Sequence, residues 1–295
     1  MRWLPSKQFL ITSSSALLAL GVVARQLASI GAGLILHPPR RSLAEGPPPT
    51  CREVTFAGAG VVLRGWHARA SGERRGTVIY LHGVADNRAS GAGVIARFRR
   101  RGFDVVAYDS RAHGESSGEA TTYGFYEKAD LQRVLDILPE GPVVLVGSSL
   151  GAAVALQAAG EDRRVSAVIA AEAFSDLRTV VQERAPFFFS AGAVAAAIRQ
   201  AEEGGRFSVE AVSPMASARQ ITVPVLIVHG AADTDTPPDH SRRVYDALGG
   251  PKRFMLVPGA GHGESLQGAV WEDIEHWLDA QVQSWKTARS AVTSV

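Results

Sequence analysis

The sequence contains a single cysteine, Cys51, among its 295 residues. One cysteine cannot form an intrachain disulfide and cannot supply a Cys-x-x-Cys metal site. The chain also lacks a G-x-x-x-x-G-K-[ST] string and a G-x-G-x-x-G string after a strand, which argues against phosphate or dinucleotide binding. We therefore expect no cofactor and no metal.

Strong charge and internal repetition are also missing. The formal net charge is +2, which is too small to indicate a nucleic-acid partner. No period of roughly 20–50 residues recurs, so repeat architectures are excluded. Apolar residues make up 46% of the chain and charged residues 20%, a balance that allows a large core in one α/β domain.

The charge that is present is unevenly placed. Residues 1–52 carry a net charge of +5, and the remainder carries −3. Within this basic segment, residues 9–36 form a long apolar run in which Arg25 is the only charged residue. A helix of this length exceeds the bilayer core of about 30 Å.

Three interpretations of this run compete: a membrane anchor, a signal peptide cleaved after Val22-Val23-Ala24, and an amphipathic helix packed on the body. We predict a transmembrane helix and a membrane-anchored or exported protein, with possible membrane association through residues 9–36. Basic residues flank both ends of the run, so they set no orientation. The stretch EGPPPT (45–50) predicts a linker between a segment 1–50 and a domain 51–295, and removal of residues 1–44 is expected to leave soluble, active protein.

After residue 50, short apolar segments alternate with helical ones. The expected strands span residues 52–58, 61–70, 76–83, 103–109, 143–147, 165–173, 223–230 and 253–261. This alternation predicts a mostly parallel eight-stranded sheet flanked by helices. The long interruption at residues 175–221, called the lid insertion below, is expected to be either a lid or a pair of packing helices.

In such sheets, ligands bind at the carboxyl ends of the strands. There the strand VVLV is followed by Gly147-Ser148-Ser149-Leu150-Gly151 and an Ala-rich helix. This G-x-S-x-G string predicts a tight strand-to-helix turn that pushes the hydroxyl of Ser149 outwards at a helix N-terminus. The alternative is an ordinary Gly-Ser turn, but the flanking strand and helix favour the nucleophile elbow.

A serine nucleophile needs a histidine base and a carboxylate that orients it. His262 follows the last strand and is the expected base, whereas His229 lies at the end of the strand VPVLIVHG and is expected to pack there. For the acid, Asp233 and Asp235 compete after the strand VPVLIVHG, and Glu172 is a third candidate. The backbone N–H groups of Leu150 and Val84 are the expected oxyanion donors.

The residues resemble the α/β-hydrolase superfamily over about residues 52–285. The resemblance rests on LHG (81–83), DSRAHGES (109–116), GSSLG (147–151), HGAAD (229–233) and GAGHGE (259–264), which occur in the family's order. More narrowly, the chain is similar to the bacterial branch of Bem46-like and serine-aminopeptidase-like hydrolases. The resemblance implies Asp233 as the acid and His262 as the base, and it implies structural roles for Asp109, Arg111 and His113.

The expected function is that of a serine hydrolase that cleaves small-molecule carboxylic esters through an acyl-enzyme on Ser149, with Asp233 and His262 completing the triad. A peptidase, thioesterase or acyltransferase of the same fold is the alternative within this chemistry. From another class, a non-catalytic membrane-tethered binding module would keep the elbow without activity.

Overall fold

An eight-stranded sheet forms the centre of the computed structural model, which describes the backbone of residues 7–293 and the side chains of residues 21–285 and 287. The strand order is β1-β2-β4-β3-β5-β6-β7-β8. The first two strands pair antiparallel, β2 pairs antiparallel with β4, and all other pairs are parallel. The strands are β1 Cys51–Ala57, β2 Val62–Ala68, β3 Gly76–Leu81, β4 Phe103–Tyr108, β5 Val143–Ser148, β6 Val165–Ala171, β7 Val225–Gly230 and β8 Lys252–Val257. The predicted mostly parallel sheet is confirmed.

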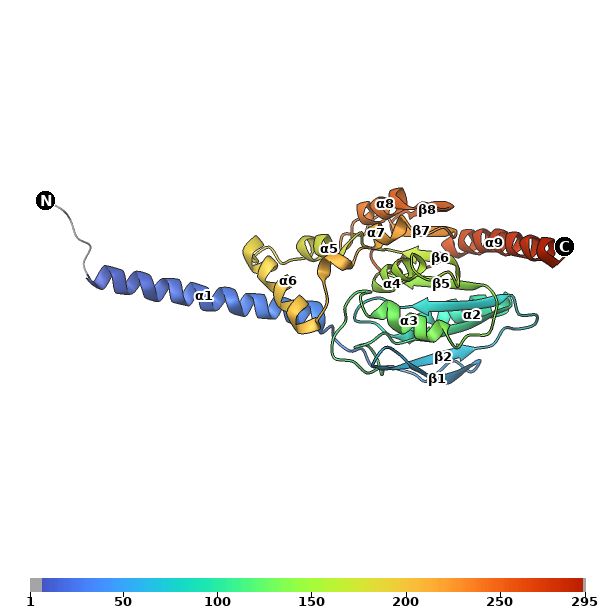
Figure 1. Ribbon diagram of the computed structural model, residues 1–295, viewed down its shortest axis with the longest axis horizontal. Coiled ribbons are helices and arrows are strands. Elements are labelled where there is room, and N and C mark those ends of the chain that lie inside the picture. Colours follow the sequence, from blue (N-terminus) through green and yellow to red (C-terminus); the bar gives the residue numbers. More distant parts are fainter. Residues whose placement is uncertain (1–6, 294–295) are drawn as a thin grey trace.

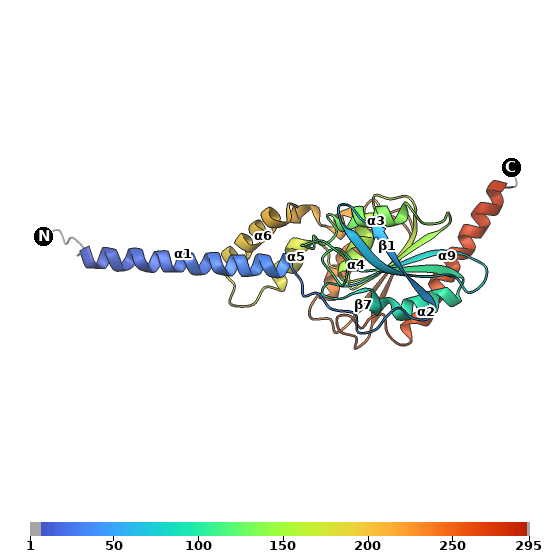
Figure 2. The same cartoon turned by 90° about the horizontal axis from the view of Figure 1, so that it is seen from below.

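Helices cover both faces of this sheet (Figures 1 and 2). One core packs the sheet against α3 (Glu127–Leu135), α4 (Leu150–Ala159), α7 (Pro214–Ala218) and α8 (Pro238–Ala247). The other core packs it against α2 (Ala92–Arg100) and α9 (Val270–Thr293). Because β3, β4 and β7 are buried at every position, their sequences are predominantly apolar rather than alternating.

The lid insertion lies between β6 and β7 and is helical. It contains α5 (Leu177–Glu183), α6 (Ala191–Gly205), a 3₁₀ turn at Val209–Ala211 and α7; a second 3₁₀ turn, Arg88–Gly91, precedes α2. Side chains of α5 and α6 form a third apolar cluster with the end of the N-terminal helix. The insertion thus packs on the N-terminal segment as well as on the sheet domain.

The N-terminal run forms one helix, α1 (Lys7–Leu36), which extends away from the body (Figures 1 and 2). Within the described residues, no helix combines the length and the apolar character needed to span a membrane. The transmembrane helix predicted over residues 9–36 is therefore not supported. Anchoring or export stays a prediction.

The carboxyl-terminal end of α1 packs closely on α6. Ala28, Ala32 and Ile35 are buried, and a Cβ atom on Gly31 would lie 2.8 Å from the Cβ atom of Ala197. A glycine at this position therefore lets the two helices approach each other.

The residues that follow α1 bind the body through polar contacts. The N–H of Thr121 donates to the carbonyl of Leu36 at 2.9 Å, and the guanidinium of Arg40 donates to the carbonyl of Ser116 at 2.6 Å. The Asn87 side chain donates to the carbonyl of Arg41 at 3.0 Å. Residues 36–41 are thus in contact with the packed body, and whether the arm can be removed stays a prediction.

The loops after β3 and β4 are joined by a buried ion pair. Asp109 is fully buried; it accepts hydrogen bonds from the backbone N–H groups of Arg88 (2.7 Å) and Glu115 (2.9 Å) and pairs with the Arg88 guanidinium. His82 Nε2 accepts from the N–H of Ser110 at 2.9 Å. These contacts hold the loop that begins at His82 against the loop that follows Tyr108.

Replacement of Asp109 by Asn should destabilise the fold, because Arg88 would keep a buried positive charge without this partner. The expected loss in unfolding free energy is about 3 kcal/mol, measured by urea denaturation. The matched control is Asp136→Asn, since Asp136 pairs with Arg164 at an exposed site and should lose less than about 1 kcal/mol. Equal losses in both variants would contradict a special role for the buried pair.

Candidate active site

Ser149 lies at the turn between β5 and α4, where it is the N-cap of the helix. Its backbone has φ +50° and ψ −111°, a strained conformation for a residue with a side chain. The flanking glycines have no room for a Cβ atom. A Cβ atom on Gly151 would lie 2.0 Å from the carbonyl oxygen of Leu81, and a Cβ atom on Gly147 would lie 2.3 Å from the carbonyl oxygen of Gly151. The turn therefore has the tight geometry that the string GSSLG predicted.

His262 and Asp233 reach Ser149 from the loops after β8 and β7. The Ser149 hydroxyl oxygen is 3.0 Å from His262 Nε2, and His262 Nδ1 is 2.7 Å from Asp233 Oδ2. A carboxylate only accepts, so Nδ1 carries the proton and donates it to Asp233. Nε2 is then free to accept from the hydroxyl. The structure thus brings together the three residues predicted as a triad.

The carboxylate of Asp233 is held by further donors. Its Oδ1 accepts from the N–H groups of Asp235 (3.0 Å) and Thr236 (2.9 Å). Burial raises the pKa of Asp233, but the hydrogen bonds from His229, His262 and Thr236 outweigh it and hold the pKa well below its usual value. Asp233 is therefore ionised at neutral pH, and of the two competing aspartates it is the one that contacts His262.

His229 is a member of this cluster that sequence reasoning assigned only to packing. It is fully buried, and its Nε2 lies 2.8 Å from the Thr236 carbonyl oxygen and 3.2 Å from Asp233 Oδ2. Both neighbours are acceptors, so Nε2 carries a proton and supports the charge of Asp233. The only signal in the sequence is its position four residues before Asp233 in HGAAD.

Glu172, the third candidate acid, holds the loop that carries His262. It follows β6 with φ +57° and is 1% exposed. Its two carboxylate oxygens accept from the N–H groups of Gly263 (2.6 Å) and Ser265 (2.9 Å). The nearer oxygen is 3.9 Å from His262 Nδ1, so Asp233 and not Glu172 bonds to the imidazole.

Glu172, Asp233 and His262 also have the spacing of a metal site, since their ligand atoms lie within 4.8 Å of one another. Each of these atoms is already engaged: Asp233 with His262, Glu172 with two backbone N–H groups, and His262 Nε2 with Ser149. A cation here would have to displace these hydrogen bonds. The donor set thus fits a hydrogen-bonded relay better than a metal centre.

The backbone segments that carry the two expected oxyanion donors lie close to Ser149. Leu150 is the first residue of α4, so its N–H has no intrahelical acceptor. A Cβ atom on Gly83 would lie 3.6 Å from the Cβ atom of Ser149. The backbone of Gly83, the residue before Val84, is therefore close to Ser149. Val84, Ser149 and His262 line one pocket with a volume of about 570 Å³. The backbone at Gly83 and at the start of α4 is thus close to Ser149, and the oxyanion donors stay a prediction.

Comparisons with known proteins agree with this fold. Residues 76–197 match the family model described as alpha/beta hydrolase fold, and residues 198–291 match that of PhoPQ-activated pathogenicity-related protein. The Bacillus subtilis (strain 168) protein YqkD is 32% identical over 216 residues, which cover 70% of each chain.

Two solved structures are similar in fold. The Pyrococcus furiosus esterase Pf2001 has a TM-score of 0.67 at 22% identity, over 84% of this chain and 98% of that one. The Pyrococcus horikoshii acylaminoacyl peptidase has a TM-score of 0.57 at 18% identity, over 74% of this chain and 38% of that one. The similarity to the Bem46-like and serine-aminopeptidase-like branch stays a prediction.

The sheet topology, the family match and the relationship to YqkD lead to one conclusion: the chain belongs to the α/β-hydrolase superfamily.

Proposed function

We propose that this α/β hydrolase is a serine hydrolase that cleaves carboxylic esters through an acyl-enzyme on Ser149. The observation that carries the proposal is the continuous line of hydrogen bonds from the Ser149 hydroxyl through His262 to the ionised Asp233. A hydroxyl is a weak nucleophile unless a base takes its proton in the transition state. His262 Nε2 is within reach to do so, and Asp233 stabilises the imidazolium that forms.

The reaction proceeds in two halves. The Ser149 oxygen attacks the ester carbonyl carbon while its proton passes to His262, and the N–H groups of Leu150 and Val84 stabilise the oxyanion. The carbon–oxygen bond to the alcohol then breaks, and His262 returns the proton to the leaving oxygen. Water then attacks the acyl carbon while one of its protons passes to His262. The bond between the acyl carbon and the Ser149 oxygen breaks, the carboxylic acid is released, and His262 returns the proton to Ser149.

We propose esters rather than amides as substrates because an ester carbonyl is attacked more readily and an alcohol leaves more easily than an amine. The pocket that holds Ser149 and His262 is lined by groups of both charges, including Arg41, Asp86 and Asp235. This mixture suits a polar leaving group without a fixed charge.

Replacement of Ser149 by Ala should lower kcat for nitrophenyl esters by roughly a millionfold, because the reaction loses its nucleophile. Ser148→Ala is the matched control and should keep activity within about tenfold, since Ser148 ends β5 and does not contact His262 in the proposed relay. The measurement is ester turnover with parallel fluorophosphonate labelling. Labelling of the Ser149→Ala protein would refute the assignment, and an inert wild-type protein would favour the non-catalytic binding module.

Asp233→Asn should lower kcat by roughly ten-thousandfold, because the amide no longer stabilises the imidazolium or selects the Nδ1–H tautomer. Asp235→Asn should change kcat by less than about tenfold, since Asp235 supports the site through its backbone N–H. Steady-state kinetics on both variants give the ranking. A larger loss in Asp235→Asn would transfer the acid role to that residue.

Glu172 acts as a positioning residue in this proposal, because it fixes the loop that presents His262. Glu172→Gln replaces one acceptor oxygen with an NH₂ group, which cannot accept a hydrogen bond from the backbone N–H that faces it. The loop should therefore shift, and kcat should fall by roughly tenfold to a hundredfold. KM and the unfolding midpoint should change little.

The matched control for this variant is Glu264→Gln. Glu264 accepts from the N–H of Gly261 at 2.8 Å in the same loop, but it is exposed, and its amide can rotate to keep one acceptor. This control should retain activity within a fewfold range. A Glu172→Gln protein that unfolds at much lower denaturant concentration, with unchanged kcat while folded, would make Glu172 structural only.

A further inference from the structure

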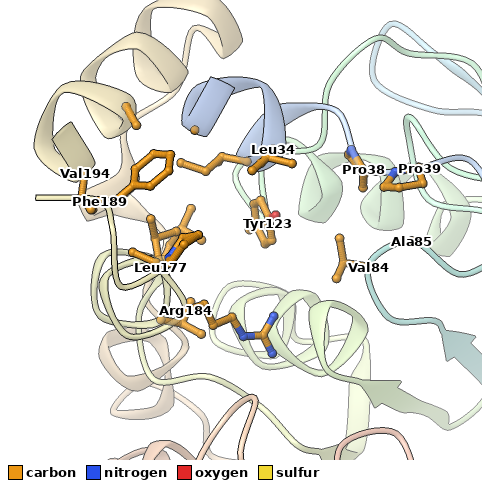
Figure 3. Close-up of a pocket in the computed structure, with 17 residues that line it drawn as sticks. Leu34, Pro38, Pro39, Val84, Ala85, Tyr123, Leu177, Arg184, Phe189 and Val194 are labelled. Atoms are coloured by element: carbon orange, nitrogen blue, oxygen red, sulfur yellow. The ribbon is translucent and has the colours of Figure 1, made fainter. Parts of the chain in front are cut away.

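A second cavity lies beside the catalytic pocket and is almost entirely apolar. Its volume is about 300 Å³. The end of α1 with its following residues, the lid insertion, and the loop after β3 together enclose it (Figure 3). Leu34 and Pro38 approach it from the N-terminal segment, Leu177 and Phe189 from the lid insertion, and Val84 from the loop.

This cavity adjoins the catalytic pocket. Val84, Ala85 and Arg184 line both. Arg184 is the one charged residue among the described residues around the apolar cavity, and its guanidinium donates to the carbonyl of Asp235 at 2.8 Å. The guanidinium of Arg184 thus binds the loop that carries Asp233, and the other side chains that line the cavity are aliphatic or aromatic.

The position of His262 sets which part of a substrate each pocket takes. The leaving alcohol must receive its proton from His262, so it lies in the pocket that His262 lines. The apolar cavity adjoins the oxyanion loop at Val84 and is not lined by His262. An ester bound with its carbonyl oxygen at Val84 and Leu150 therefore directs its acyl group toward the cavity.

We infer that this cavity is the acyl-chain site, and that the end of α1 is the wall that sets the length of the chain. The substrates are esters of a medium-length apolar acid with a polar alcohol. This inference rests on the proposed serine-esterase function. A water molecule takes up about 30 Å³ in the liquid, and a methylene group is similar in size, so the cavity holds roughly eight to ten carbons.

The role of α1 changes what its removal would do. Gly31, Leu34 and Ile35 of the helix, with Pro38 and Pro39 after it, belong to the cavity lining. A truncation of residues 1–44 would open the acyl site to solvent while leaving Ser149, Asp233 and His262 in the chain. Such a protein would keep activity on acetate esters and lose its preference for longer acids.

The test compares two exposed apolar residues of α1 that are one turn apart. Leu34 lines the cavity and Ile30 does not, although they are 66% and 57% exposed. In the full-length protein, kcat/KM for nitrophenyl esters should rise by about fourfold for each added methylene until the cavity is full. Leu34→Gln should lower kcat/KM for the decanoate ester by about tenfold and leave the acetate ester unchanged, whereas Ile30→Gln should change neither.

A third variant tests the size of the cavity from the opposite wall. Val181 lines it from α5 and is only half-buried, so Val181→Trp should fold and should shift the optimum to shorter acids. If wild-type protein hydrolyses acetate and decanoate esters equally, and Leu34→Gln and Val181→Trp alter nothing, the acyl site is refuted while the serine-esterase function stands.

Binding of decanoate to the Ser149→Ala protein, measured by isothermal titration calorimetry, separates the two proposals. Decanoate binding that is weakened by an added Leu34→Gln and unaffected by an added Ile30→Gln supports the acyl site. If such binding occurs but the wild-type protein turns over no ester, only the esterase function is refuted. Absence of binding, together with a flat chain-length profile, overturns the acyl site.

Discussion

The strained turn at Ser149 is the constraint on which the rest of the site depends. A non-glycine residue at φ +50° is tolerated because glycines on both sides let the start of α4 press against β3 and β5. This contact brings the hydroxyl to the carboxyl edge of the sheet, beside the loops after β7 and β8. Because β6, β7 and β8 all run parallel to β5, the loops after β7 and β8 begin at the same edge of the sheet and can supply the acid and the base.

Buried carboxylates hold the loops around that turn in place. Asp233 accepts two backbone N–H groups of its own loop, Glu172 accepts two from the His262 loop, and Asp109 accepts two from the loops after β3 and β4. A carboxylate can accept several hydrogen bonds at once, so one side chain stabilises a whole loop. The same chemistry that makes Asp233 an acceptor for His262 therefore also organises the surroundings of the site.

The N-terminal segment and the lid insertion complete the molecule on the side where substrate is expected to bind. They are more than a hundred residues apart in the chain, yet Gly31 of α1 packs on Ala197 of α6. Their contact closes an apolar space next to the oxyanion loop. A segment whose composition resembles an anchor thus contributes to the lining of a cavity. Under the proposed acyl site, chain-length selectivity is a property of the α1–α6 interface.

The sequence by itself determined the parallel sheet and singled out Ser149 and His262, because apolar runs, the GSSLG turn and the order of loops along the chain are local features. It left Asp233 and Asp235 open on residue chemistry alone, since both follow β7 and only the packed loop decides which carboxylate turns toward His262. It also predicted a transmembrane helix and a separable arm, which stay predictions, and it placed His229 among packing residues. Only the tertiary structure decided that His229 contacts Asp233, that Glu172 holds the His262 loop and that α1 packs on α6, because the last two contacts join segments about ninety or more residues apart whose meeting depends on the packing of the whole chain.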